Sequence, residues 1–126
     1  SNFAKNLGIA FQIKDDMLDY SLSSKHIGKP TLQDLREGKI TYPLYFAMKA
    51  GGKNDKKFLQ SFLGVQDKYD ASKVLNKIED LGGNYKTEEL LINYIKKSKN
   101  LANKIENKQV REEMLNLSKF SYERTK

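Results

Sequence analysis

Residues 2–20 constrain the fold most, because their apolar side chains recur at the spacing of one helix face. Positions i, i+4, i+8 and i+11 are occupied by Ile9, Ile13, Met17 and Tyr20. This spacing predicts a helix whose apolar stripe packs against a core. Serines and a glycine follow Tyr20, and they predict the exit from the helix at that point.

The same predicted helix carries three carboxylates, Asp15, Asp16 and Asp19. At about 100° per residue, Asp15 and Asp16 lie roughly 40–60° from Asp19 around the helix, so all three are expected to point to one side. Like charges at this spacing repel, and the C-terminal end of a helix already carries partial negative charge. A divalent cation would relieve both penalties, since carboxylate oxygens suit Mg²⁺ that also holds a phosphate. The alternative is a solvated acidic surface, which is common in a chain that is 31% charged.

The next segment, residues 28–44, carries basic residues. Gly28, Pro30 and Gly38 predict a loop with fixed bends. Lys29 and Lys39 lie near the two ends of this loop, and we expect a polyanion to be held between them.

Beyond Pro43, the pattern predicts helices joined by short loops, because no run alternates apolar and polar residues as a strand would. The expected helices cover residues 44–49, 54–63, 71–81, 87–105 and 108–122. Thr87 is expected to cap the fourth of them, and glycines 82–83 to end the third. The last helix is expected to turn an apolar stripe toward a core, formed by Val110, Met114, Leu117 and Phe120. The fold is therefore expected to be all-α.

The net charge of +7 comes from lysines spread along the whole chain, while arginine occurs only at Arg36, Arg111 and Arg124. Nucleic-acid sites usually cluster arginine with aromatic residues, so no nucleic-acid partner is expected. The absence of cysteine excludes disulfides, thiolate metal sites and a cysteine nucleophile, and it fits a cytoplasmic location. No apolar run approaches the roughly 18 residues of a membrane span.

Three motifs in a fixed order, FQIKDDMLDY, GKP and DLREGKITYPL, give the chain a resemblance to a known family. Through them, residues 8–43 resemble the C-terminal half of a trans-isoprenyl diphosphate synthase, most closely the octaprenyl or long-chain polyprenyl type. The family's first aspartate-rich motif and its site for isopentenyl diphosphate have no counterpart here. The resemblance therefore implies that residues 1–126 form a single all-helical unit, the C-terminal helices of a larger isoprenoid-synthase-type bundle.

By this resemblance, four carboxylates would serve a metal. Asp15, Asp16 and Asp19 match the second aspartate-rich motif, which binds Mg²⁺ bridging to the diphosphate of the allylic substrate. Asp34 matches an acidic residue that orders the water shell of the metal. The implied cofactor is Mg²⁺.

The resemblance also implies a substrate site. Phe11 and Gln12 match a pair that lines the pocket beside the allylic substrate, and Lys29 and Lys39 match lysines that contact its diphosphate. The implied catalytic groups are Asp15, Asp16, Lys29 and Lys39.

The implied activity is the condensation of an allylic diphosphate with isopentenyl diphosphate to an all-trans polyprenyl diphosphate of the octaprenyl class. The implied full-length protein is a homodimer, whereas the 126 residues alone are expected to be inactive and to expose apolar surface. Four alternatives stay open at this point: a short-chain farnesyl or geranylgeranyl diphosphate synthase, a non-catalytic synthase-like subunit, a class I terpene cyclase or head-to-head synthase, and a basic helical module that binds RNA or an acidic partner.

Overall fold

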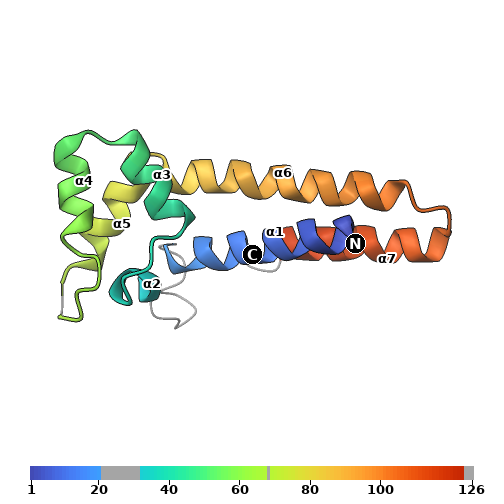
Figure 1. Cartoon of the computed structure of the whole chain (residues 1–126), viewed down its shortest axis with the longest axis horizontal. Coiled ribbons are helices and arrows are strands. Elements are labelled where there is room, and N and C mark those ends of the chain that lie inside the picture. The colour runs from blue at the N-terminus through green and yellow to red at the C-terminus, as the bar shows by residue number, and fades with distance from the viewer. Residues whose placement is uncertain (21–31, 68, 124–126) are drawn as a thin grey trace. The chain divides into compact units, whose positions relative to one another are not determined.

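The computed structural model describes residues 1–20, 32–67 and 69–123. These described residues form helices and no strand, which confirms the all-α fold (Figure 1). The elements are α1 (Asn2–Asp19), α2 (Gln33–Arg36), α3 (Tyr42–Ala50), α4 (Lys53–Gln60), α5 (Ala71–Asp80), α6 (Gly83–Asn103) and α7 (Lys108–Glu123). No helix among the described residues combines the length and the hydropathy that crossing a membrane requires.

The helix α1 ends within one residue of its expected end, and its apolar stripe is partly as expected. Ile13 and Tyr20 are fully buried, whereas Ile9 and Met17 are only partly buried. The buried side of α5 agrees with the sequence pattern, because Val74, Leu75 and Ile78 have at most 1% of their surface exposed.

Two local expectations were wrong. The predicted loop over residues 28–44 contains a short helix, α2, and α3 begins at Tyr42. Thr87 does not cap α6, which begins at Gly83, and its buried hydroxyl donates to the Gly83 carbonyl at 2.7 Å inside the helix. Gly82, with a φ of 79°, makes the turn between α5 and α6, so only one of the paired glycines serves as a helix stop.

The described helices group into two compact units, and the first consists of Ser1–Asp15 and Glu89–Lys126. Its core joins Phe3 and Leu7 of α1 with Ala102 of α6, and Met114 and Leu115 of α7 pack against this cluster.

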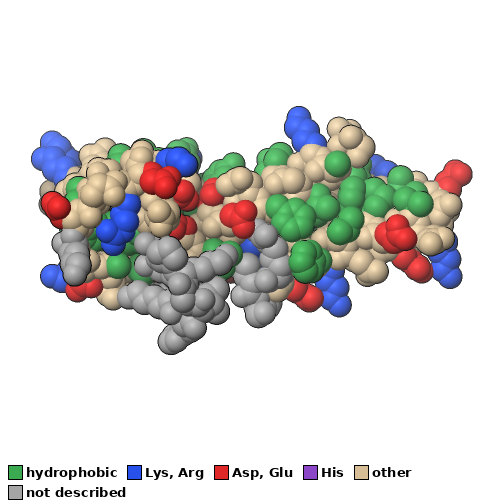
Figure 2. Space-filling model, turned by 90° about the horizontal axis from the view of Figure 1, so that it is seen from below, with side chains coloured by type: hydrophobic (Ala, Val, Ile, Leu, Met, Phe, Trp, Pro, Cys, Tyr) green, Lys and Arg blue, Asp and Glu red, His purple; other side chains and the backbone are tan. Residues whose placement is uncertain are grey.

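The last helix agrees with the expectation only in part, because Met114 packs against the core of its unit and the other three residues of the expected stripe do not. Val110, Leu117 and Phe120 of α7 are 43%, 47% and 57% exposed, while Ser118 and Ser121 are buried. The side of α7 that faces its own unit thus carries Met114, Leu115 and these two serines, while the three exposed apolar residues point outward. Figure 2 shows hydrophobic side chains gathered on the surface of this unit, over α1 and α7.

The second unit, Asp16–Glu88, contains the larger core. Helix α3 contacts both α4 and α5, and the fully buried side chains include Leu35, Leu44, Leu59 and Ile78. Each buried residue of this size contributes about 1.5–3 kcal/mol relative to an exposed position. This core fixes the segments that carry the candidate site. The expectation that residues 1–126 form one unit of a larger domain stays a prediction.

Candidate functional site

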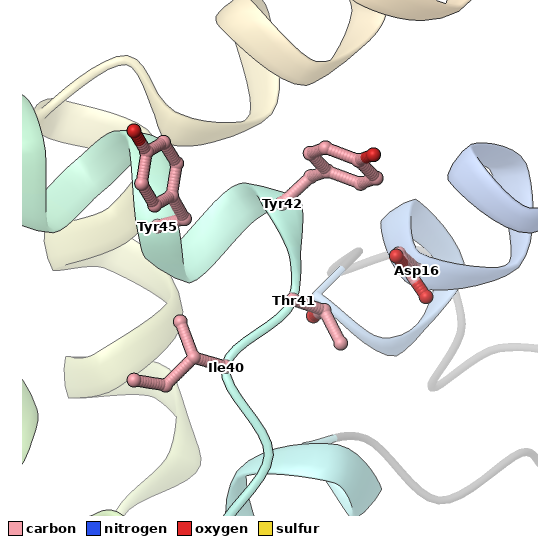
Figure 3. Close-up of a pocket in the computed structure, with 5 residues that line it drawn as sticks. All are labelled: Asp16, Ile40, Thr41, Tyr42 and Tyr45. Atoms are coloured by element: carbon pink, nitrogen blue, oxygen red, sulfur yellow. The ribbon is translucent and has the colours of Figure 1, made fainter.

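A cavity in the second unit lies beside one of the expected site carboxylates. It has a volume of about 580 Å³ and is lined by Asp16, Ile40, Thr41, Tyr42 and Tyr45 (Figure 3). Asp16 comes from the last turns of α1, and the other residues come from the start of α3 and the irregular segment before it. Pro43 occupies the first turn of α3, where proline is tolerated because that N–H would have no helical partner.

The cavity has an acidic side and an apolar side. Asp16 is only 6% exposed, so its carboxylate belongs to the protein interior rather than to a solvated surface. On the other side, Ile40 and Tyr45 are 52% and 49% exposed, and the Tyr45 ring packs edge-on against Phe46 with centroids 5.4 Å apart. A molecule with a charged end and a hydrocarbon body matches this division.

Asp19 lies one turn beyond Asp16 and makes two hydrogen bonds to backbone. Its Oδ1 accepts from the Gln33 N–H at 2.7 Å, and its Oδ2 accepts from the Asp34 N–H at 2.9 Å. Burial raises the pKa of this carboxyl above 3.8, and the two backbone hydrogen bonds act in the opposite direction. The neighbouring Tyr20 is fully buried, and desolvation raises the pKa of its hydroxyl well above 10.0, so this phenol stays neutral.

Asp34 and Lys39 belong to the same turn. Asp34 is partly buried on α2, and its carbonyl accepts from the Lys39 N–H at 2.8 Å. The Lys39 side chain is exposed, and its ammonium lies 3.2 Å from the Glu37 carboxylate. This contact raises the pKa of Lys39 above 10.5, so the side chain stays cationic at neutral pH. An anionic ligand at Lys39 would have to compete with Glu37.

The remaining predicted site residues belong to other parts of the chain. Phe11, Gln12 and Asp15 lie in the first unit. The Phe11 ring is tilted against Phe120 at 6.4 Å, and Gln12 and Asp15 are exposed. Lys29 lies outside the described residues, so its position is not part of the site geometry.

The donor set suits a metal that is shared with a substrate. Within residues 1–20, 32–67 and 69–123, no group of three or more carboxylate, histidine or cysteine side chains lies close enough to hold a metal ion. Mg²⁺ seldom needs such a cage, because it usually binds through one or two carboxylates, water and substrate phosphates. The hard oxygens on α1 fit that mode of binding.

Sequence reasoning missed two features of this site. It did not assign Ile40, Thr41, Tyr42 and Tyr45 to a cavity. The signal available was the position of the ITYPL stretch directly after Lys39. It also missed the bonds of Asp19 to Gln33 and Asp34, for which no local pattern exists.

Comparison with known proteins places the chain in a family. Residues 1–81 match the family model described as polyprenyl synthetase. The decaprenyl-diphosphate synthase of Dictyostelium discoideum is 32% identical over 126 residues, which is 100% of this chain and 27% of that protein. Three of the curated relatives match more than half of this chain, and the chain spans about a quarter of the length of each of them.

Solved structures share the fold. The geranylgeranyl pyrophosphate synthetase of Pyrococcus horikoshii superposes with a TM-score of 0.86 at 29% identity, covering 97% of this chain and 37% of that one. The polyprenyl synthase of Caulobacter crescentus, in a structure with calcium and isoprenyl diphosphate, gives 0.81 at 29% identity and covers 96% and 38% of the two chains. The motifs, the helical fold and the matched family model agree, and the chain belongs to the polyprenyl synthetase family.

Proposed function

We propose that a full-length protein containing this chain is a Mg²⁺-dependent trans-prenyltransferase, which condenses an allylic diphosphate with isopentenyl diphosphate. The observation that carries the proposal is the cavity with buried Asp16 on one side and Ile40, Tyr42 and Tyr45 on the other. A prenyl diphosphate has an anionic end and a hydrocarbon body, and a divalent cation held between its diphosphate and Asp16 would make its anionic end compatible with the acidic side of the cavity. Family membership supports this assignment over a basic module that binds RNA.

Asp15 and Asp16 are the proposed metal ligands. They are adjacent on α1 and offer the hard oxygens that Mg²⁺ prefers. The structure of the Caulobacter polyprenyl synthase with calcium and isoprenyl diphosphate supports the binding of a divalent cation. When bound, the cation would neutralise charge on the diphosphate.

The protein's own part in the reaction is electrostatic. The bond between the allylic carbon and the diphosphate oxygen breaks, and the electron pair leaves with the diphosphate. Lys29 and Lys39 are proposed to stabilise that leaving group, because positively charged side chains attract the negative charge that develops on it. The π electrons of isopentenyl diphosphate then form the new carbon–carbon bond, and a proton is lost to restore a double bond. Phe11 and Gln12 are proposed to line the hydrocarbon side of the substrate site.

The proposed product is a long-chain all-trans polyprenyl diphosphate of the octaprenyl class. The relation to the decaprenyl-diphosphate synthase of Dictyostelium supports a long chain. A short-chain product is the second candidate, because the Pyrococcus neighbour is a geranylgeranyl pyrophosphate synthetase. Homodimer formation and a cytoplasmic location stay predictions, as does the inactivity of the 126 residues alone.

The test compares wild type with Asp15→Ala in the full-length protein. Loss of one metal ligand at the leaving group should lower turnover by about 10²–10³-fold or more. Asp67→Ala is the matched control, because it removes an exposed carboxylate from a segment outside the helices and should leave turnover unchanged. Chromatography of the wild-type products under excess isopentenyl diphosphate reports the chain length.

Two results would count against the proposal. Wild-type turnover in Asp15→Ala would show that this carboxylate is not a ligand at the leaving group. A product pool that ends at the short-chain stage would leave the prenyltransferase assignment intact and refute the long-chain product.

A further inference from the structure

Helix α2 lacks a cap of its own. The residue before it, Leu32, has no side-chain acceptor and adopts a left-handed conformation with φ 61° and ψ 28°. It is the only non-glycine residue with positive φ among the described residues. Leucine rarely adopts this conformation, so contacts from elsewhere must hold the start of α2 in place.

Asp19 supplies those contacts from the end of α1. Its backbone carbonyl accepts from the Leu32 N–H at 2.9 Å. Its two carboxylate oxygens accept from the next two N–H groups, those of Gln33 at 2.7 Å and Asp34 at 2.9 Å. Three consecutive backbone N–H groups therefore donate to Asp19, which caps the start of α2 although it is distant in the sequence.

The held turn carries two of the predicted site residues. The Asp34 N–H donates to Asp19 Oδ2 at 2.9 Å, and the Asp34 carbonyl accepts from the Lys39 N–H at 2.8 Å. The far side of the turn is fixed by different residues, since the Leu35 carbonyl accepts from the Gly64 N–H at 2.8 Å.

We propose that Asp19 is a positioning residue, which holds α2 by its two carboxylate oxygens and so fixes Asp34 and Lys39 for the diphosphate. The second part of this statement rests on the proposed function. In this proposal, Asp19 has a positioning role in place of the metal-ligand role that was expected for it together with Asp15 and Asp16. A hydrogen-bonded carboxylate oxygen keeps a second lone pair, so experiment must separate the two roles.

The first experiment needs neither metal nor substrate. Asp19→Asn keeps the shape of the side chain, but its amide nitrogen cannot accept a hydrogen bond and would face a backbone N–H. Amide hydrogen exchange, followed by NMR in the 126-residue chain, should therefore be at least about tenfold faster at Gln33 or Asp34. The exchange rate at Leu75, in the core of α5, should not change and reports that the variant is folded.

Asp70→Asn is the matched control. Asp70 caps α5 by accepting from the Ser72 N–H at 3.0 Å, and asparagine is an equally good N-cap residue. Exchange at Ser72 should stay within about twofold of wild type. Unchanged exchange at both Gln33 and Asp34 in Asp19→Asn would overturn the proposed cap, whatever the protein catalyses.

The second experiment measures the Mg²⁺ dependence of turnover in the full-length protein. For a positioning residue, Asp19→Asn should raise the KM for the allylic diphosphate or lower kcat, with the Mg²⁺ concentration for half-maximal activity within about twofold of wild type. A rise of that concentration by tenfold or more would identify a metal ligand and overturn the proposal. If wild type transfers no prenyl groups, the proposed function and the link to the diphosphate fail together, while the amide exchange still decides the cap.

Discussion

Gly83 is the residue at which the second unit leaves least room for a side chain. A Cβ at this position would collide with the Pro43 carbonyl, and it would lie 2.8 Å from Ile78 Cγ2 and 3.2 Å from Ala47 Cβ. The first of these neighbours is backbone and cannot move aside cheaply. Helix α6 therefore starts in contact with α3 and α5 because its first residue has no side chain.

We predict that Gly83→Ala destabilises the chain by about 1–3 kcal/mol, because crowding outweighs the gain in helix propensity. Gly8→Ala is the control. Gly8 is exposed in the middle of α1 with nothing within 4 Å of the added Cβ, so alanine there should stabilise by about 0.5–1 kcal/mol. Thermal unfolding followed by circular dichroism measures both, and a Gly83→Ala variant at least as stable as wild type would disprove the close contact.

At the residue scale, the sequence predicts which side chains are candidates for a functional site better than it predicts the groups to which they are hydrogen-bonded. Charge and spacing alone identify the carboxylates of α1 as unusual. The partners of Asp19 could not be predicted, since Gln33 and Asp34 are 14 and 15 positions away and the bond goes to their backbone. The side chains of Gln33 and Asp34 take no part in these hydrogen bonds, so their residue types do not predict them.

At the element scale, Asp55 caps the start of its own helix, α4, and also links α4 to α5. One of its oxygens accepts from the Gly52 N–H at the start of α4 at 3.1 Å, and the other lies 3.1 Å from the Lys77 ammonium on α5. The hydrogen bond with Lys77 is the main cause that lowers the pKa of Asp55 below 3.8, and the bond from Gly52 adds to it.

The lowered pKa means that the Asp55 carboxylate stabilises the folded chain at neutral pH. The folded chain binds the Asp55 proton less tightly than the unfolded chain, so the stabilisation is fully present above the unfolded value and is lost as the pH falls below 3.8 through the folded pKa. Asp55→Asn should therefore lower the unfolding midpoint at neutral pH, and the gap to wild type should shrink in acid. Glu106→Gln, at an exposed carboxylate between α6 and α7, should open no such gap. A gap that is constant with pH would show that Asp55 acts through its shape alone.

Element boundaries were predicted best where one apolar face repeats for several turns, as in α1, α5 and α7. The helix α2 was missed because it has a single turn and is stabilised from outside by Asp19 rather than by its own residues. The orientation of α7 was missed for a different reason. Hydrophobic periodicity shows that a face is apolar, but it does not show whether the covering surface belongs to the same chain.

For the whole molecule, the outward side of α7 is the feature with the clearest consequence. Val110, Leu117 and Phe120 lie on one side of this helix and are all more than 40% exposed. Large apolar side chains exposed on one side of a helix often mark an interaction surface. We predict that the 126-residue chain self-associates at high concentration and binds an apolar dye.

Replacing Leu117 and Phe120 together by glutamine should weaken this association by about tenfold or more, because large apolar side chains at an interface commonly contribute over 1 kcal/mol each. Tyr85→Gln is the control, since Tyr85 is 64% exposed but belongs to the second unit. Light scattering measures the effect. A compact wild-type monomer without dye-detectable apolar surface would contradict the prediction.

The boundary between the two units falls inside helices. It passes between Asp15 and Asp16 within α1, and between Glu88 and Glu89 within α6. A cut at either place would leave several backbone N–H and C=O groups without helical partners. An engineered chimera that exchanges one unit and keeps the other therefore has to be joined inside α1 and α6, because neither crossing lies in a loop.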